Sequence, residues 1–148
     1  MSAEKSVLFD GSYGLSVRLD KAVTFEEAIE KTKASFKAAG FGLPPGTTDL
    51  NMAGIFQGKF PGEFDLPQMR VIGFCSPPHA LKALMTERSA ALLIPCNVCV
   101  AMTADNVVEV AAIEPYALLG IINRKDELRS LVEEIRTMVK AGLAGITA

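Results

Sequence analysis

The first pattern in the chain is an alternation of apolar and polar residues over positions 13–19. Alternation with a period of two is typical of a strand with one buried face. We expect four side chains of this strand to face inward: Tyr13, Leu15, Val17 and Leu19.

A helix is predicted directly after this strand. Thr24 and Glu27 form a capping box, in which each side chain accepts a hydrogen bond from the backbone of the other residue. Gly40 predicts the end of the helix in a left-handed conformation, with Phe41 folding back against it. The residues that share one face at helical spacing are Phe25, Ala28, Ile29, Thr32 and Phe36.

Proline and glycine interrupt residues 41–67 and break regular structure there. We expect one strand in this stretch and a short helix over residues 50–59. The apolar face of that helix consists of Met52, Ile55 and Phe56.

A strand over residues 69–74 and a helix ending near Thr86 follow. Ser76 is a favourable N-cap, and Pro77 takes the first helical position, where its missing N–H costs nothing. We expect this helix to bury Ala80, Leu81, Leu84 and Met85.

The next segment predicts a hairpin. A long apolar strand is expected over residues 91–102, and a second strand over 107–113. Asp105 and Asn106 form the turn between them.

The last element is an amphipathic helix. It is expected to begin at Asn123 or Asp126 and to end at Gly142. Its apolar stripe contains Leu128, Leu131, Val132, Ile135, Met138 and Val139.

The order of these elements predicts an α+β fold, a largely antiparallel sheet with helices packed on one face. The 148 residues match the length of one domain, with residues 1–10 as a flexible or edge segment.

The hairpin region indicates whether the other face of the sheet is exposed to solvent. Residues 90–122 carry only three charges, Asp105, Glu109 and Glu114, whereas a face turned to solvent needs more polar positions. We therefore expect the second face to be covered, either by a homodimer partner or by a ligand in a pocket. Glu109 is expected to point outward from an edge of the sheet.

Composition narrows the classes of function. Hydrophobic residues make up 49% of the chain, which excludes intrinsic disorder, and a formal net charge of -2 leaves no basic excess for binding nucleic acid. The chain has no secretory-type segment and no apolar stretch of membrane-spanning length, so we expect a soluble, cytoplasmic protein with no membrane partner. Three cysteines are too few for a disulfide scaffold and fit a reducing compartment.

Two cysteine segments carry a resemblance to a known family. They read Val-Ile-Gly-Phe-Cys-Ser-Pro-Pro-His-Ala at 71–80 and Leu-Ile-Pro-Cys-Asn-Val-Cys-Val at 93–100. Together they resemble the DUF302 family, whose hallmark is a Gly-x-Cys-Asn-Pro-x-x-Ala segment followed by a Pro-Cys-Asn-Val-x-Val strand. The matching positions are Gly73, Cys75, Pro77, Ala80, Pro95, Cys96, Asn97, Val98 and Val100.

The resemblance implies a TATA-binding-protein-like fold of β-α-β(4)-α order with short extra helices, and a homodimer. It supplies no settled active site and no cofactor. Three departures stand out: Ser76 replaces the usual Asn, residues 43–46 replace a regular strand, and Cys99 is additional.

Cys75 and Cys96 are the leading candidates for chemistry. Cys75 lies just before a helix N-terminus, whose partial positive charge can lower the pKa of a thiol. Cys96 lies in an apolar strand, where burial raises the pKa and favours an inert thiol. The two would suit a redox pair, a sulfur carrier, or a soft-metal or haem site if they meet, which their spacing does not settle.

Cys96 and Cys99 form a Cys-x-x-Cys pattern, and Cys75 and His79 would complete a set of four zinc ligands. We expect no metal, because residues i and i+3 of a strand point to opposite faces. His79 is the only histidine. It is either a base for Cys75 or an exposed helix residue without a role.

The sequence therefore predicts a homodimeric small-ligand binding module rather than an enzyme, with a small apolar or sulfur-containing ligand in a cleft near Cys75 and Cys96. One alternative is a thiol-based redox or sulfur-carrier protein that uses Cys75 with Cys96. The other is a structural or interaction subunit without chemistry. The catalytic candidates are Cys75, Cys96 and His79, and the predicted ligand-binding residues are Gly73, Cys75, Ser76, Pro95, Cys96 and Asn97.

Overall fold

The computed structural model describes residues 6–46 and 48–147, and this part of the chain forms one five-stranded sheet. The strand order is β1-β5-β4-β3-β2, and all neighbouring strands run antiparallel. The predicted α+β class is confirmed. The strands are β1 (Gly14–Arg18), β2 (Asp49–Asn51), β3 (Gln68–Phe74), β4 (Cys96–Met102) and β5 (Val108–Ile113).

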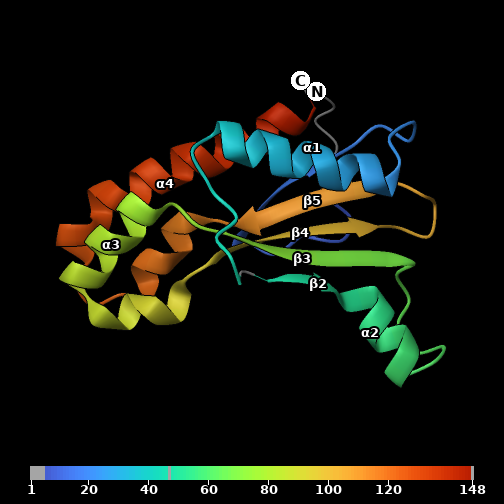
Figure 1. The fold of residues 1–148 in the computed structure, drawn as a ribbon, viewed down its shortest axis with the longest axis horizontal. Helices are drawn as coiled ribbons and strands as arrows, with labels where there is room; N and C mark the ends of the chain where they lie inside the picture. The colour runs from blue at the N-terminus through green and yellow to red at the C-terminus, as the bar shows by residue number, and fades with distance from the viewer. Residues whose placement is uncertain (1–5, 47, 148) are drawn as a thin grey trace.

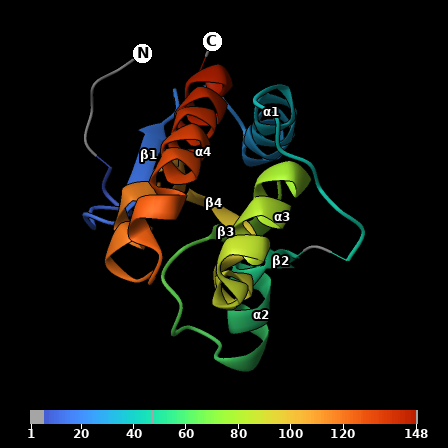
Figure 2. The ribbon, with the colours of Figure 1, turned by 90° about the vertical axis from the view of Figure 1, so that its left-hand side faces the viewer.

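Helices α1 and α4 lie side by side across one face of the sheet (Figure 1). Helices α2 and α3 stand at opposite ends of the sheet, and Figure 2 shows α3 next to the α1–α4 pair. No helix in the described ranges is both long enough and apolar enough to cross a membrane. The helices are α1 (Phe25–Ala38), α2 (Met52–Lys59), α3 (Pro77–Thr86), the short 3-10 helices η1 (Arg88–Leu93) and η2 (Pro115–Gly120), and α4 (Lys125–Ile146).

The hydrophobic core lies between the sheet and the α1–α4 pair. Phe36 of α1 stacks on Phe74 of β3 with the ring centroids 5.0 Å apart, and Phe41 lies 5.6 Å from Phe36. Aromatic side chains bury large apolar areas, so this cluster dominates the stability of the core. The buried strand residues packed with it are Ile72, Val98, Val100, Val108 and Val110.

The predicted start and end of α1 are confirmed. The Thr24 hydroxyl accepts a hydrogen bond from Glu27 N, and the Glu27 carboxylate accepts one from Thr24 N, both at 3.2 Å. Gly40 has a φ of 108°, which favours glycine, and Phe41 N donates back to Phe36 O at 3.0 Å. All five residues of the predicted apolar face are buried.

Helix α4 does not end at Gly142, as the sequence predicted, but continues to Ile146. A Cβ atom at Gly142 would come within 2.9 Å of the Phe36 ring, and one at Gly145 within 2.1 Å of Ser35 Oγ. These glycines therefore allow close contact between α4 and α1 and are packing residues rather than helix terminators.

The strand predicted over residues 91–102 is wrong in its first half. η1 occupies residues 88–93, the Ile94–Pro95 peptide bond is cis, and β4 begins only at Cys96. An apolar run is compatible with a strand or with a tight helical turn, and apolarity alone does not distinguish them. The predicted hairpin turn is present, with Asn106 at a φ of 62°.

Three predicted inward faces also need correction. Tyr13 precedes β1 and is exposed, and Leu81 and Met85 of α3 are exposed as well. α3 packs against α4 and η1 at the end of the sheet rather than over it, so none of its residues is fully buried. The predicted helix over residues 50–59 begins at Met52, after the three residues of β2, and exposes Ile55.

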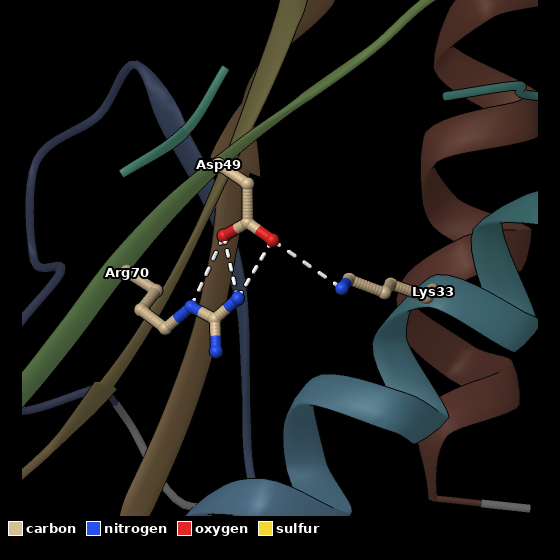
Figure 3. A network of polar contacts seen from close by, with 3 residues as sticks. All are labelled: Lys33, Asp49 and Arg70. Carbon is tan, nitrogen blue, oxygen red and sulfur yellow. Dashed lines mark hydrogen bonds and ion pairs between the residues drawn. The ribbon is translucent and has the colours of Figure 1, made fainter. Parts of the chain in front are cut away.

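An ion-pair network fastens the short edge strand β2 to the rest of the fold (Figure 3). Asp49 of β2 accepts hydrogen bonds from Arg70 of β3 at 2.6–3.0 Å, and Lys33 of α1 lies 3.3 Å from the same carboxylate. Burial raises the pKa of Asp49, but the hydrogen bonds and positive charges of Arg70 and Lys33 outweigh it and hold the pKa below its usual value.

Candidate functional site

The second face of the sheet is the one turned away from α1 and α4. Cys99 of β4 lies between Val71 of β3 and Ala111 of β5 in the strand register. These positions alternate with the buried core valines and therefore point to the second face. The N-terminal segment, residues 6–13, lies against the β5 and β4 part of this face.

Glu109 of β5 holds the N-terminal segment. Its side chain is fully buried and accepts hydrogen bonds from Val7 N at 2.9 Å, from Leu8 N at 3.2 Å and from the Ser6 hydroxyl. The expectation that Glu109 points outward is wrong, because these donors take the place of water around the carboxylate. Residues 6–8 of the predicted flexible segment are thus bonded to the sheet, and residues 1–5 lie outside the described residues.

A hollow of about 360 Å³ lies between the N-terminal segment and the sheet. This second-face hollow is within the size range of small-molecule pockets, about 300–1,000 Å³. Asp10 and Asn97 are its polar lining residues. The apolar part of its lining includes Leu8, Phe9, Tyr13, Cys99, Ala111 and Ile113.

A smaller pocket, of about 50 Å³, lies at the end of β3 and β4 beside α3. This helix-side pocket brings together Cys75, Ser76, His79 and Cys96, four of the residues that the sequence singled out. The rest of its lining is apolar, with Phe41, Phe74, Ala80, Ala83, Ile94 and Ile135.

Ser76, His79 and Glu134 form a chain of hydrogen bonds beside this pocket. Ser76 Oγ lies 2.6 Å from His79 Nδ1, and His79 Nε2 lies 3.0 Å from Glu134 Oε2 of α4. Ser76 occupies the predicted N-cap position of α3, but its hydroxyl makes no capping bond to the backbone. The hydroxyl instead serves the histidine ring, an arrangement that N-cap preference did not predict.

The thiols beside the pocket are not acidic. Burial raises the pKa of Cys75, so the expected lowering by the helix N-terminus is wrong. Burial, with a smaller contribution from the neighbouring Cys75, raises the pKa of Cys96 to about 11. Both thiols line the helix-side pocket, and Phe74, the neighbour of Cys75, pairs with Cys96 in the strand register, so the two thiols are close, which the sequence could not settle.

Cys96 and Cys99 point to opposite faces of β4, as strand geometry requires. Cys96 lines the helix-side pocket and Cys99 lines the second-face hollow, where burial raises the pKa of Cys99 to about 11. Across the described ranges, no three His, Cys, Asp or Glu side chains come together as a metal site.

The remaining predicted ligand-binding residues do not lie together in one cavity. Asn97 lines the second-face hollow rather than the helix-side pocket. Gly73 is buried in β3, where its N–H donates to Thr48 O at 2.8 Å, and Pro95 follows the cis bond before β4. Neither belongs to the lining of the two cavities.

The sequence predicted a cover over the second face, by a partner or by a ligand in a pocket, but not that the N-terminal segment and Glu109 build the hollow there. The signal was the apolar Leu8 and Phe9 ahead of the first strand, together with Glu109 among apolar strand residues. A carboxylate in such a strand needs donors from elsewhere in the chain, and the N-terminal segment supplies them.

Comparison with known proteins agrees with this architecture. The crystal structure of an uncharacterized conserved DUF302 protein from Bacillus stearothermophilus superposes with a TM-score of 0.79 at 20% sequence identity, covering 92% of this chain and 99% of that one. This similarity shows a shared fold. No curated protein matches the sequence. The family model described as domain of unknown function DUF302 matches residues 15–146, and the chain therefore belongs to the DUF302 family.

Proposed function

We propose that this protein binds a small, mainly apolar molecule in the second-face hollow. The single observation that carries the proposal is the hollow itself, with its volume of about 360 Å³ and its mostly apolar lining. Binding sites for small molecules are concave and apolar with a few polar groups that orient the ligand. Asp10 and Asn97 are the polar groups available here.

The helix-side pocket is less suited to hold a whole ligand. Its volume of about 50 Å³ accommodates a group of only a few atoms. The predicted cleft near Cys75 and Cys96 is therefore replaced, in this proposal, by the larger cavity on the other side of β4. Asn97 is the one predicted ligand-binding residue that the proposal retains.

The N-terminal segment forms one wall of the proposed binding site. Its backbone N–H groups are fixed by the buried Glu109 carboxylate, so the wall is held in place before a ligand arrives. A pre-formed cavity avoids part of the entropy cost of ordering a site on binding.

We also propose that a second copy of the chain covers the rest of the second face. Leu50, Val71 and Cys99 are neighbours in the strand register and give this region an apolar strip, in which Leu50 is 43% exposed. Closed two-fold dimers are the commonest assemblies of soluble proteins. Light scattering is expected to give the mass of a dimer for the unchanged protein and the mass of a monomer for Leu50→Glu. If the unchanged protein has the mass of a monomer at every concentration, the proposal of a dimer is contradicted.

A thiol-based function stays the second candidate. The closeness of Cys75 and Cys96 favours it. Their raised pKa values oppose it, because nucleophilic attack needs the thiolate. The rate of thiol alkylation in the native protein distinguishes the two candidates.

The fluorescent dye anilinonaphthalene sulfonate, an aromatic molecule with one sulfonate group, tests the binding proposal. Ala111 lines the hollow, so Ala111→Leu places three extra carbon atoms into it. We expect saturable dye binding by the unchanged protein and an affinity at least about tenfold weaker in Ala111→Leu, which corresponds to roughly 1.4 kcal/mol. Ala144→Leu, on the exposed side of α4, is the matched control and is expected to bind like the unchanged protein. No saturable binding, or equal binding by Ala111→Leu, would overturn the proposal.

A further inference from the structure

Ser76, His79 and Glu134 have the arrangement of a nucleophile, a base and a carboxylate. We propose that Ser76 is a nucleophile that accepts small acyl groups from activated esters in the helix-side pocket. This activity is independent of ligand binding in the second-face hollow, because the two cavities lie on opposite sides of β4.

The hydrogen bonds determine where the protons lie. Glu134 Oε2 is a carboxylate oxygen 3.0 Å from His79 Nε2, so a neutral ring carries its proton on Nε2 and donates it to Glu134. Nδ1 then has a free lone pair directed at Ser76 Oγ, 2.6 Å away. Ser76 must donate its hydroxyl proton to Nδ1, which is the configuration of a nucleophile with a general base.

The local sequence explains why the hydroxyl is available. Ser76 stands at the N-cap of α3, where a serine ordinarily bonds to a backbone N–H of the first turn. Pro77 and Pro78 occupy the next two positions and have no N–H to offer, so the N–H of His79 is the one remaining capping donor, and the Ser76 hydroxyl makes no bond to it. His79 follows in the same turn, so its ring reaches back to the hydroxyl, while α4 supplies Glu134 from the far side.

The pocket restricts the size of the acyl group. The pocket has a volume of about 50 Å³, and its lining apart from Cys75, Ser76, His79 and Cys96 is apolar. An acetyl group fits a space of this size, and a long acyl chain or an aromatic ring does not. The expected substrates are therefore esters of short carboxylic acids, with the alcohol part outside the pocket.

The reaction is a transfer of an acyl group without oxidation or reduction. Ser76 Oγ forms a bond to the ester carbonyl carbon as its proton passes to His79 Nδ1. The bond from that carbon to the alcohol oxygen breaks, and the alcohol leaves with the proton from His79. Water then attacks the acyl-serine with His79 accepting a proton, which releases the carboxylic acid and restores the Ser76 hydroxyl.

Incubation with p-nitrophenyl acetate tests the proposal. We expect release of nitrophenol and, in the early phase, one acetyl group per chain, which peptide mass mapping locates on Ser76. Ser76→Ala is expected to lose the acetyl group and to react about a hundredfold more slowly. Acetyl transfer to Cys75 or to lysines alone, or an unchanged rate in Ser76→Ala, would overturn the proposal.

Glu134 is a positioning residue. Its test must distinguish the loss of this role from a loss of folding. It is exposed on α4, so substitution there is compatible with folding. We expect acetylation of Ser76 to slow about tenfold or more in Glu134→Gln and to recover in Glu134→Asp, which keeps a carboxylate for His79. Glu133→Gln, on the neighbouring exposed position, is the control with unchanged rate. Equal rates in Glu134→Gln and Glu133→Gln would contradict the role of Glu134.

Discussion

The two cavities on either side of β4 differ in how the chain builds them. The helix-side pocket takes Cys75, Ser76 and His79 from one short segment and adds Cys96 from the paired strand. The second-face hollow joins the N-terminal segment to β4 and β5, about a hundred residues further along the chain. A site made from neighbouring residues leaves a motif in the sequence, and a site made from distant ones does not.

The two cavities also differ in their size and in the chemical groups around them. The helix-side pocket is small and is surrounded by groups that can react, the hydroxyl, the imidazole and two thiols. The second-face hollow is large and mainly apolar, and one of its walls is the N-terminal segment that the buried Glu109 carboxylate holds. We conclude that one side of β4 is suited to chemistry on a small group and the other to holding a whole molecule.

The largest expected effect is a loss of stability on substitution in the core, in contrast to substitution on the second face. Phe36→Ala removes a buried ring that packs on Phe41 and Phe74, and we expect a loss of about 3–5 kcal/mol in the free energy of unfolding. Tyr13→Ala removes an exposed ring from the second-face hollow and is expected to change stability by less than about 0.5 kcal/mol. Urea unfolding measures both, and similar losses would contradict this division.

Glu109→Gln tests whether the carboxylate holds the wall of the hollow. A Gln side chain replaces one acceptor oxygen by an NH2 group, so the bond from Val7 N to Oε2 becomes a contact between two donors, at a cost of about 1–3 kcal/mol. We expect limited proteolysis to cut residues 6–13 faster than in the unchanged protein. Glu30→Gln, exposed on α1, is the control, and equal cleavage in the two variants would show that Glu109 does not hold the segment.

Alkylation tests whether either side of β4 carries a reactive thiol. The pKa of Cys75 is raised, and those of Cys96 and Cys99 are raised to about 11, so little thiolate exists near neutral pH. We expect slow reaction with iodoacetamide that accelerates as the pH rises, and fast reaction of all three thiols in denaturant. Fast alkylation of native Cys75 below neutral pH would favour the thiol-based function.

The smallest expected effect concerns the ion-pair network at β2. The pKa of Asp49 is lowered in the fold, so its stabilising contribution is present above the unfolded value of 3.8 and is lost as the pH falls through the lower folded value. The groups are partly exposed, and we expect Asp49→Asn to lower the free energy of unfolding by less than about 1 kcal/mol at neutral pH. In urea unfolding, the difference between the two proteins is expected to shrink as the pH falls from 3.8 through the lowered folded value, and to vanish below that value. A difference that persists there would assign the effect to something other than the charge of Asp49.

The parts of the fold that could be predicted depend on local rules. The capping box at Thr24, the left-handed Gly40 and the turn at Asn106 were all predicted because a few adjacent residues determine them. Gly142 was misinterpreted because its role depends on Phe36 of another helix. The sequence offers no sign of that contact.

In the candidate site, too, the sequence predicted what neighbouring residues determine and not what distant residues determine. The sequence indicated Cys75, Ser76, His79 and Cys96, and the fold brings them to one pocket. It did not reveal that Ser76 bonds to the histidine ring, because Glu134 comes from α4 and fixes the proton on that ring.

The most direct test of the central claim is a native mass spectrum of the protein purified without reductant or chelator. We expect an added mass from a small molecule, lost in Ala111→Leu and retained in Cys75→Ser. An added mass lost in Cys75→Ser and retained in Ala111→Leu would place the ligand on the other side of β4. That result, or a spectrum with no added mass, would contradict ligand binding in the second-face hollow.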